Sequence, residues 1–258
     1  MSLDFSKIFI FVVANLEFDY YYHFIQMRKM QFEKYNIPHL FLFEYKPPDY
    51  YKSNNNDYFL ELDPEPFVFD PSIKTNPGFH PLMIVKFIKG LRKINLDKYD
   101  YIIRINLSTY INFPQLHNLV YSYERTNLMA GTVLSITLAD WDIYKVDKHK
   151  FVSGTCIIFS SDVAKFIASY KLDDPILYKH CDDTVLGHIC LPVVKYLCSK
   201  GFLYIGDNRP ISDYELMNNV IIRIKYQLNQ RNCNIRRWIY LLKLNDQIYY
   251  ERNPIIGT

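Results

Sequence analysis

Short apolar runs of strand length alternate along this chain with longer stretches in which apolar residues recur at helical spacing. The run Ile8-Phe-Ile-Phe-Val-Val13 is one example, and a continuous apolar run of this length is typical of a strand that is buried on both faces. Alternation of such strands with amphipathic helices predicts an α/β fold with a mostly parallel central sheet and helices on both faces. The expected strands are residues 7–14, 39–44, 58–62, 101–105, 128–133, 155–159 and 202–205.

The helices are predicted from periodicity and from residues that favour helix starts. Apolar side chains follow Phe18 at helical spacing, Pro81 suits a first helical position, and Asn112 and Ser161 suit N-caps. Two acidic residues at 182 and 183 favour another helix start, because carboxylates stabilise the positive end of the helix dipole. The expected helices are residues 18–35, 81–93, 113–123, 161–168 and a long one from 182 to just before Gly201.

The chain has 258 residues, 49% of them hydrophobic, which is enough for one large α/β domain. No Gly/Ser-rich or Pro-rich linker divides it. We therefore expect a single domain over residues 1–258, with a core of about 5–210 and a C-terminal extension, 211–258, that packs on the core. Residues 46–57 are rich in Pro, Asn, Asp and Lys and are expected to form a surface loop.

Charge, cysteine usage and hydropathy exclude several classes of protein. A net charge of +3 with scattered basic residues does not predict nucleic-acid binding. The five cysteines have no zinc-ligand spacing, and those at 181, 190 and 198, in or beside one expected helix, are expected to be buried reduced thiols. The sequence predicts no signal peptide and no transmembrane segment, so a cytoplasmic protein is expected.

Polar residues stand where expected strands end. Asn15 follows the first strand, and Asn106 and Ser108 follow the strand at 101–105. Because ligands of open α/β sheets bind beyond the carboxyl ends of the strands, these residues are expected at one edge, where a nucleotide would lie. The alternative interpretation is that Asn106 and Ser108 only stabilise a turn, as Asn and Ser commonly do.

Three segments together resemble glycosyltransferases of the fringe-like and β3-glycosyltransferase group, which have the GT-A fold. The first is Arg104-Ile-Asn-Leu-Ser-Thr-Tyr-Ile-Asn112, which in that group reads roughly Lys-Val-Asp-Asp-Asp-Thr-Tyr-Val-Asn. The second is Ser153-Gly154-Thr-Cys156, similar to Ser-Gly-Ala-Gly. The third is Asp182-Asp-Thr-Val-Leu-Gly187, similar to Asp-Asp-Cys-Thr-Ile-Gly. The tail segment Arg223-Ile-Lys225 resembles the Arg-x-Lys tail of related enzymes from large DNA viruses.

The resemblance implies a single GT-A (Rossmann-like) domain that transfers a sugar, with inversion, from a UDP- or GDP-sugar to a glycan or protein hydroxyl. For a viral enzyme, the host cytoplasm or the virion would be its location. It implies that Asp183 or Asp182 is the catalytic base, with Asp183 preferred. The residues that would bind the donor are Asn15, Lys86, Arg104, Asn106, Ser108, Arg223 and Lys225. The sugar and acceptor pocket would contain Ser153, Gly154 and Trp141.

The cation that such enzymes use is expected to be only weakly required here. Mn²⁺ and Mg²⁺ are hard cations that prefer carboxylate oxygens, whereas Asn106 and Ser108 replace the two carboxylates of the family pattern. Basic side chains are expected to neutralise the diphosphate instead. Lys86 could equally lie on a solvated helix face, and Arg223 and Lys225 on the polar face of an amphipathic strand.

Two other functions remain open from the sequence. A nucleotidyltransferase would share a Rossmann-like sheet, but it would need a Gly-rich loop after the first strand, and Asn15-Leu-Glu-Phe18 contains no glycine. A catalytically inactive module of the same fold, which binds a nucleotide or a sugar, would explain the missing carboxylates at 106 and 108. The acidic pair at 182 and 183 favours an enzyme, although helix capping alone would also explain it.

Overall fold

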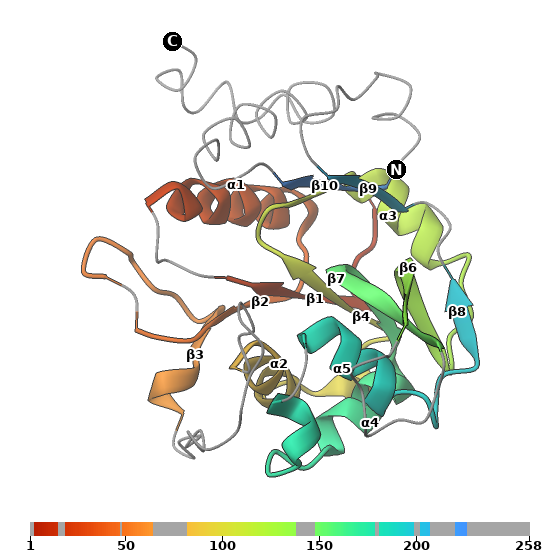
Figure 1. Cartoon of the computed structure of the whole chain (residues 1–258). Coiled ribbons are helices and arrows are strands. Elements are labelled where there is room, and N and C mark those ends of the chain that lie inside the picture. Colours follow the sequence, from red (N-terminus) through yellow and green to blue (C-terminus); the bar gives the residue numbers. More distant parts are fainter. Residues whose placement is uncertain are drawn as a thin grey trace.

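A seven-stranded sheet with the order β3-β2-β1-β4-β7-β6-β8 forms the centre of the computed structural model (Figure 1). The structure describes residues 3–14, 19–46, 48–63, 82–137, 148–178, 181–198, 202–206 and 220–225. Strands β3, β2, β1 and β4 run parallel to one another, β7 is antiparallel to β4 and β6, and β8 is parallel to β6. The strands are β1 Ile8–Val13, β2 His39–Phe43, β3 Asp57–Phe59, β4 Tyr101–Asn106, β6 Leu128–Thr137, β7 Lys148–Ser160 and β8 Tyr196–Cys198.

Helices cover both faces of this sheet, so the predicted α/β class with a mostly parallel sheet is confirmed (Figure 1). Helices α1 (Asp19–Tyr35) and α3 (Phe113–Val120) pack on one face, and their buried side chains form one hydrophobic core. On the other face lie α2 (Leu82–Arg92), α4 (Ser161–Ser169) and α5 (Asp182–Ile189), which form a second core.

The alternation of side chains along β4 explains how one strand serves both cores. Ile103 and Ile105 join the core under α1 and α3, whereas Ile102 joins the core under α2, α4 and α5. Arg104 is completely buried on the same strand, and its guanidinium lies over the ring of Phe87 of α2. A charged residue in a fully buried strand needs partners, and these partners define the candidate site described below.

A smaller sheet of order β5-β10-β9 adjoins the carboxyl end of β4. It contains β5 (Thr109–Ile111), β9 (Phe202–Gly206) and β10 (Ile221–Lys225). Strand β10 belongs to the expected C-terminal extension, and it is antiparallel to β5 and parallel to β9. Short 3₁₀ helices occur at Leu60–Leu62, Leu96–Lys98 and Pro175–Tyr178.

The long helix expected from residue 182 to just before Gly201 is wrong. Helix α5 ends at Ile189, and the chain turns and re-enters the sheet as β8. Pro192 follows within three residues of the helix end, and proline lacks the N–H that another helical turn needs. The N–H groups of Val193 and Val194 both bond the carbonyl of Cys190, which closes the turn.

Smaller corrections concern strand lengths, one cap and one thiol. The strand expected at 58–62 stops at Phe59, and the strands at 128–133 and 155–159 are parts of the longer β6 and β7. Helix α4 begins after Ser160, whose hydroxyl is bonded to the backbone of Leu128, so Ser161 is not its cap. Cys190 is buried as expected, but Cys181 is exposed.

Candidate functional site

The carboxyl ends of the parallel strands bring chemically active residues to one edge of the sheet. Strands β1 and β4 run in register, so that Val13 lies beside Asn106. The side-chain oxygen of Asn106 is buried and accepts no hydrogen bond from the described residues. Ser108 follows in the turn between β4 and β5 and is partly buried. This is the edge at which the sequence predicts a ligand.

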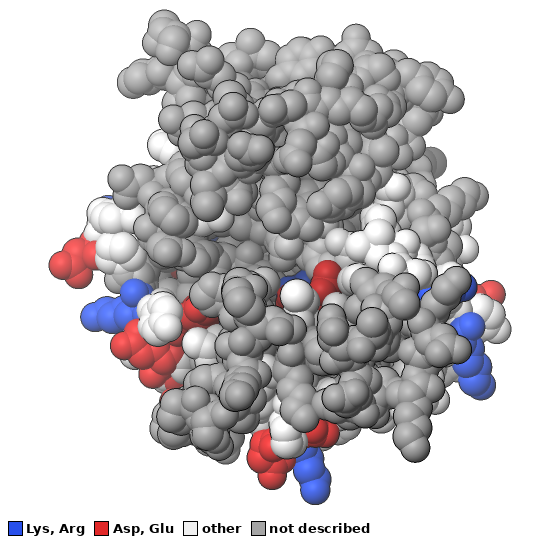
Figure 2. All heavy atoms as spheres, in the orientation of Figure 1, with Lys and Arg blue, Asp and Glu red and all other residues white. Residues whose placement is uncertain are grey.

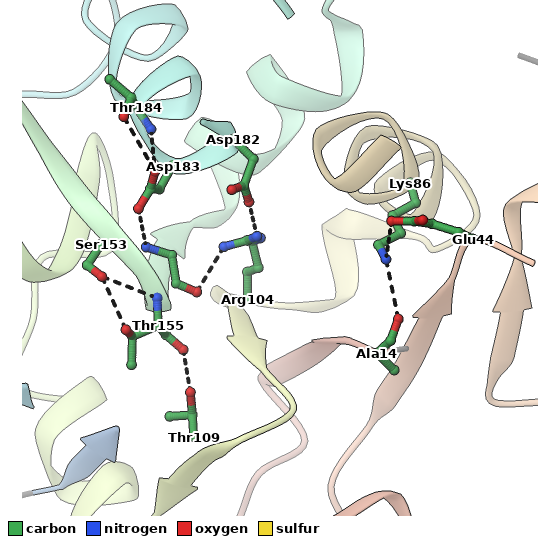
Figure 3. A network of polar contacts seen from close by, with 11 residues as sticks. Ala14, Glu44, Lys86, Arg104, Thr109, Ser153, Thr155, Asp182, Asp183 and Thr184 are labelled. Carbon is green, nitrogen blue, oxygen red and sulfur yellow. Dashed lines mark hydrogen bonds and ion pairs between the residues drawn. The ribbon is translucent and has the colours of Figure 1, made fainter. Parts of the chain in front are cut away.

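Arg104 connects three of the predicted segments (Figure 3). Its Nη1 donates to the carbonyl of Gly154 at 3.0 Å, and its Nη2 forms an ion pair with Asp182 Oδ2. Residues that are 50 and 78 positions away along the chain therefore share one guanidinium. The segments that contain Arg104, Gly154 and Asp182 are the three on which the resemblance to glycosyltransferases depends.

Asp183 lies beside this ion pair and is fixed by two backbone N–H groups (Figure 3). Its Oδ2 accepts from the N–H of Gly154 at 2.9 Å, and its Oδ1 accepts from the N–H of Thr184 at 2.9 Å. Burial raises the pKa of the Asp183 carboxyl, and the neighbouring charge of Asp182 raises it further. The Gly154 N–H and Arg104 act in the opposite direction without reversing the shift.

The backbone of β7 approaches this network so closely that position 154 must lack a side chain. A Cβ atom at Gly154 would lie 2.9 Å from Arg104 Nη1 and 3.4 Å from Asp183 Cβ. The first of these distances requires a shift of the guanidinium, which is itself buried. A glycine at position 154 therefore leaves room for two side chains of the protein itself, Arg104 and Asp183.

Lys86 is buried on α2 beside the same network (Figure 3). Its Nζ donates to Glu44 Oε1 and to the carbonyl of Ala14, both at 3.3 Å. Burial lowers the pKa of Lys86, and the Glu44 carboxylate opposes this effect. The solvated-face interpretation of Lys86 is therefore wrong, because this side chain is only 2% exposed. Lys86 links the carboxyl ends of β1 and β2 instead.

A second group of polar contacts joins β7 to the turn after β4. The hydroxyl of Thr109 donates to the carbonyl of Thr155 at 2.7 Å, and the hydroxyls of Ser153 and Thr155 are 3.1 Å apart. Arg28 of α1 donates to the carbonyl of Thr109 from the other side of the sheet. These contacts fix the backbone of β5 next to Ser108.

Strand β10 reaches the site through β5. Its residue Arg223 is in register with Thr109, which follows Ser108 directly. The side chains of Arg223 and Lys225 lie outside the described part of the structure, as do the whole residues Asn15 and Trp141. Sequence reasoning did not single out Glu44 or Thr155, and Thr109 entered it only as part of the segment that resembles glycosyltransferases. A carboxylate directly after the strand at 39–43 was the available signal for Glu44.

The donor atoms at this edge do not fit a tightly held divalent cation. Asn106 and Ser108 supply one amide oxygen and one hydroxyl, and the nearby carboxylate of Asp182 is already paired with Arg104. In the described ranges, no three His, Cys, Asp or Glu side chains are grouped as metal ligands would be. Mg²⁺ and Mn²⁺ prefer sites in which carboxylates offset their charge.

Positive and negative side chains lie near one another among the described residues of one face of the molecule. Figure 2 shows acidic and basic atoms side by side near the middle of the face that it displays, and others at its margins. A mixed distribution agrees with the small net charge of +3 and does not favour a polyanionic nucleic-acid partner.

Comparisons with known proteins give a similarity of fold. The chain matches no protein-family model and no curated protein. Among solved structures, it is similar to the crystal structure of a glycosyltransferase involved in the glycosylation of the major capsid of PBCV-1. The two share 8% sequence identity with a TM-score of 0.45, over 92% of this chain and 98% of that chain. A similarity at this level does not identify an activity. None of the helices in the described ranges is both long and apolar enough to cross a bilayer.

Proposed function

We propose that this chain is an inverting glycosyltransferase that uses a nucleotide-diphospho sugar, with Asp183 as the catalytic base. The observation that carries the proposal is the meeting of three distant segments at the carboxyl edge of the sheet. Arg104, Gly154 and the pair Asp182-Asp183 form one hydrogen-bonded network there. These are the segments that resemble the fringe-like enzymes, and their convergence supports a shared site.

The proposed reaction needs a base and a stabilised leaving group. The acceptor oxygen attacks the anomeric carbon, its proton passes to the Asp183 carboxylate, and the bond from the anomeric carbon to the diphosphate oxygen breaks. The electron pair of that bond leaves with the nucleoside diphosphate. Asp183 suits the first task because its two oxygens are oriented by the N–H groups of Gly154 and Thr184, and each carboxylate oxygen can accept a further proton donor.

In this proposal the cations Arg223 and Lys225, rather than a divalent metal, neutralise the charge of the leaving diphosphate. The backbone register of Arg223 with Thr109 supports this assignment, because it brings β10 beside the turn that contains Ser108. The neutral donor atoms of Asn106 and Ser108 support it as well, since they hold a divalent ion weakly. The Asn106 oxygen, which has no hydrogen-bond partner among the described residues, is suited to accept a hydrogen bond from a hydroxyl of the donor.

A panel of UDP- and GDP-sugars tests the proposal, with release of nucleoside diphosphate as the readout. We expect turnover of at least one donor by the wild type. Asp183→Asn should lower that turnover by about 10²- to 10⁴-fold, the usual contribution of general acid–base catalysis. Asp97→Asn is a matched control, because it makes the same chemical change at a side chain that is 79% exposed.

The alternative is an inactive module that binds a nucleotide or a sugar. Asn106 and Ser108 favour it, because they replace the carboxylates expected of a metal-dependent enzyme. Binding of a nucleotide sugar by calorimetry, without turnover of any donor by the wild type, would support the module and contradict the enzyme.

A further inference from the structure

We infer that Arg104 is a positioning residue that gives the two adjacent carboxylates different roles, with Asp182 as its partner and Asp183 free to act as the base. The role of Asp183 as a base in this inference rests on the proposed function. It reassigns Arg104, which the sequence places among the donor-binding residues. The evidence is the closed set of contacts among Arg104, Gly154 and the two aspartates.

The contacts pass through a single residue of β7, Gly154. Arg104 Nη1 donates to the carbonyl of Gly154, while the N–H of Gly154 donates to Asp183 Oδ2. Arg104 Nη2 donates to Asp182 Oδ2, so one guanidinium contacts both Gly154 and Asp182. Any rotation of the guanidinium would therefore disturb both the counter-ion of Asp182 and the residue that orients Asp183.

Arg104 is not placed to receive a donor. Its side chain is 0% exposed, both of its terminal nitrogens are occupied, and its plane is held near the ring of Phe87, with 6.0 Å between the guanidinium carbon and the ring centre. A diphosphate that displaced Asp182 from this guanidinium would leave a carboxylate without its partner. The geometry therefore indicates that the positive charge of Arg104 serves the two carboxylates and not the binding of a donor.

The charged and titratable groups around Asp183 come from its own segment, from β4 and from α2. Asp182 and Cys181 lie on its own segment; burial raises the pKa of the Cys181 thiol, and both carboxylates raise it further. Arg104 comes from β4. Lys86 from α2 interacts with Arg104 and Asp182, and it is held in turn by Glu44. Strand β7 contributes the backbone N–H of Gly154.

The two members of the ion pair act on Asp183 in opposite directions. Arg104 lowers the pKa of Asp183, and Asp182 raises it. Arg104→Gln should therefore move the titration of Asp183 to higher pH, and Asp182→Asn should move it to lower pH. If the pair acted on Asp183 only through the contact that holds Gly154 and α5 in place, both variants should shift the midpoint in the same direction, because each breaks the same contact.

The experiment is a ¹³C NMR titration of aspartate side-chain carboxyls, with the Asp183 signal assigned by its loss in Asp183→Asn. Arg104→Gln should raise the midpoint by about 1 pH unit or more, since a nearby opposite charge typically shifts a carboxyl by about 1–3 units. Asp182→Asn should lower it. Arg104→Lys and the double variant Arg104→Gln/Asp182→Asn should lie close to the wild type, and Asp97→Asn should leave it unchanged.

Shifts of both single variants in the same direction, or no shift in either, would overturn the inference. If Arg104→Gln does not fold, Asp182→Asn decides alone, because a raised or unchanged midpoint contradicts the proposed roles. The pH–rate profile of an active donor should move with the same signs. The NMR midpoints can be measured without turnover. A wild type that transfers no sugar would overturn the proposed function, whereas the titration would still test the inference about Arg104.

Discussion

At the scale of single residues, Gly154 serves the site through both of its backbone polar groups. Its carbonyl accepts from Arg104 and its N–H donates to Asp183, so the peptide must approach both side chains closely. Gly154→Ala would force the new methyl group to within 2.9 Å of Arg104 Nη1. We expect a destabilisation of about 1–3 kcal/mol from this overpacking and a loss of turnover on the order of 10²-fold from the misplaced base.

Gly90→Ala is the matched control for this variant. Its methyl group would lie 2.7 Å from Leu42 Cδ2 in the core under α2, away from the carboxylates. A comparable fall in the free energy of unfolding is therefore expected, measured by urea denaturation, with kcat close to that of the wild type. Equal losses of kcat in both alanine variants would show that the effect of Gly154→Ala is general destabilisation.

The pH dependence of transfer should reflect the environment of Asp183. Burial and the charge of Asp182 raise its pKa above the ordinary value of 3.8. A base must be ionised to accept a proton, so activity should be lost as the pH falls through this raised pKa and should be restored above it. The acid limb of kcat/KM, measured from about pH 3 to pH 8, should therefore have its midpoint above 3.8. A limb at or below 3.8 would contradict the assignment of Asp183.

Lys86 and Glu44 form a buried ion pair whose loss should be costly for the fold. Glu44→Gln leaves the Lys86 ammonium, only 2% exposed, without a carboxylate. Breaking a buried pair by changing one partner typically costs about 3–5 kcal/mol. We expect a loss near the lower end, since Ala14 still accepts from Lys86. The double variant Glu44→Gln/Lys86→Met should recover most of this loss in urea denaturation, and a double variant as unstable as Glu44→Gln would contradict the pairing.

At the scale of elements, strand β10 connects the C-terminal part of the chain to the site. Its register places Arg223 beside Thr109 of β5. If the cations of β10 neutralise the leaving diphosphate, Arg223→Ala should weaken the binding of UDP or GDP by about tenfold or more, as loss of a charged hydrogen bond of about 1.5–3 kcal/mol implies. Binding of uridine or guanosine should change little. Calorimetry measures both, and Lys195→Ala, at an exposed residue directly before β8, is the control.

Elements could be predicted from the sequence where the signal is local. Strand β1 and helix α1 are visible as an apolar run and a helical periodicity, and Asn112 caps α3 through Gln115 as its position suggests. Strand β8 could not be predicted, because residues 196–198 become a strand only by pairing with β6. The same holds for β5 and β10, whose pairing joins distant parts of the chain.

In the candidate site too, local motifs could be predicted from the sequence, whereas contacts between distant residues could not. The acidic pair 182–183 and the glycine at 154 were recognisable as motifs. The hydrogen-bond partners of these motifs could not be recognised in the sequence. Arg104 contacts residues 50 and 78 positions away, and Lys86 contacts Glu44 across 42 positions. A side chain in a strand can face either core, and the burial of Arg104 depends on partners that only the folded chain supplies.

At the scale of the whole molecule, the sheet separates two hydrophobic cores, and the network lies at the carboxyl edge on the side of the second core (Figures 1 and 3). A ligand that binds the native state at this edge should stabilise the entire domain, by about 2.7 kcal/mol at a concentration of 100 Kd. For a domain of this size, such a gain raises Tm by several degrees, at about 2–4 °C per kcal/mol.

This stabilisation should not depend on a divalent cation. The edge offers Asn106 and Ser108 where a tightly bound metal would need carboxylates, and Asp182 is occupied by Arg104. A saturating nucleoside diphosphate, UDP or GDP, should therefore raise Tm almost equally with EDTA and with added Mn²⁺ or Mg²⁺. Differential scanning calorimetry with uridine or guanosine as the control separates the contribution of the diphosphate. A shift that disappears in EDTA and returns with Mn²⁺ would mean that the neutral donors of this edge do hold the metal, and that Arg223 and Lys225 do not replace it.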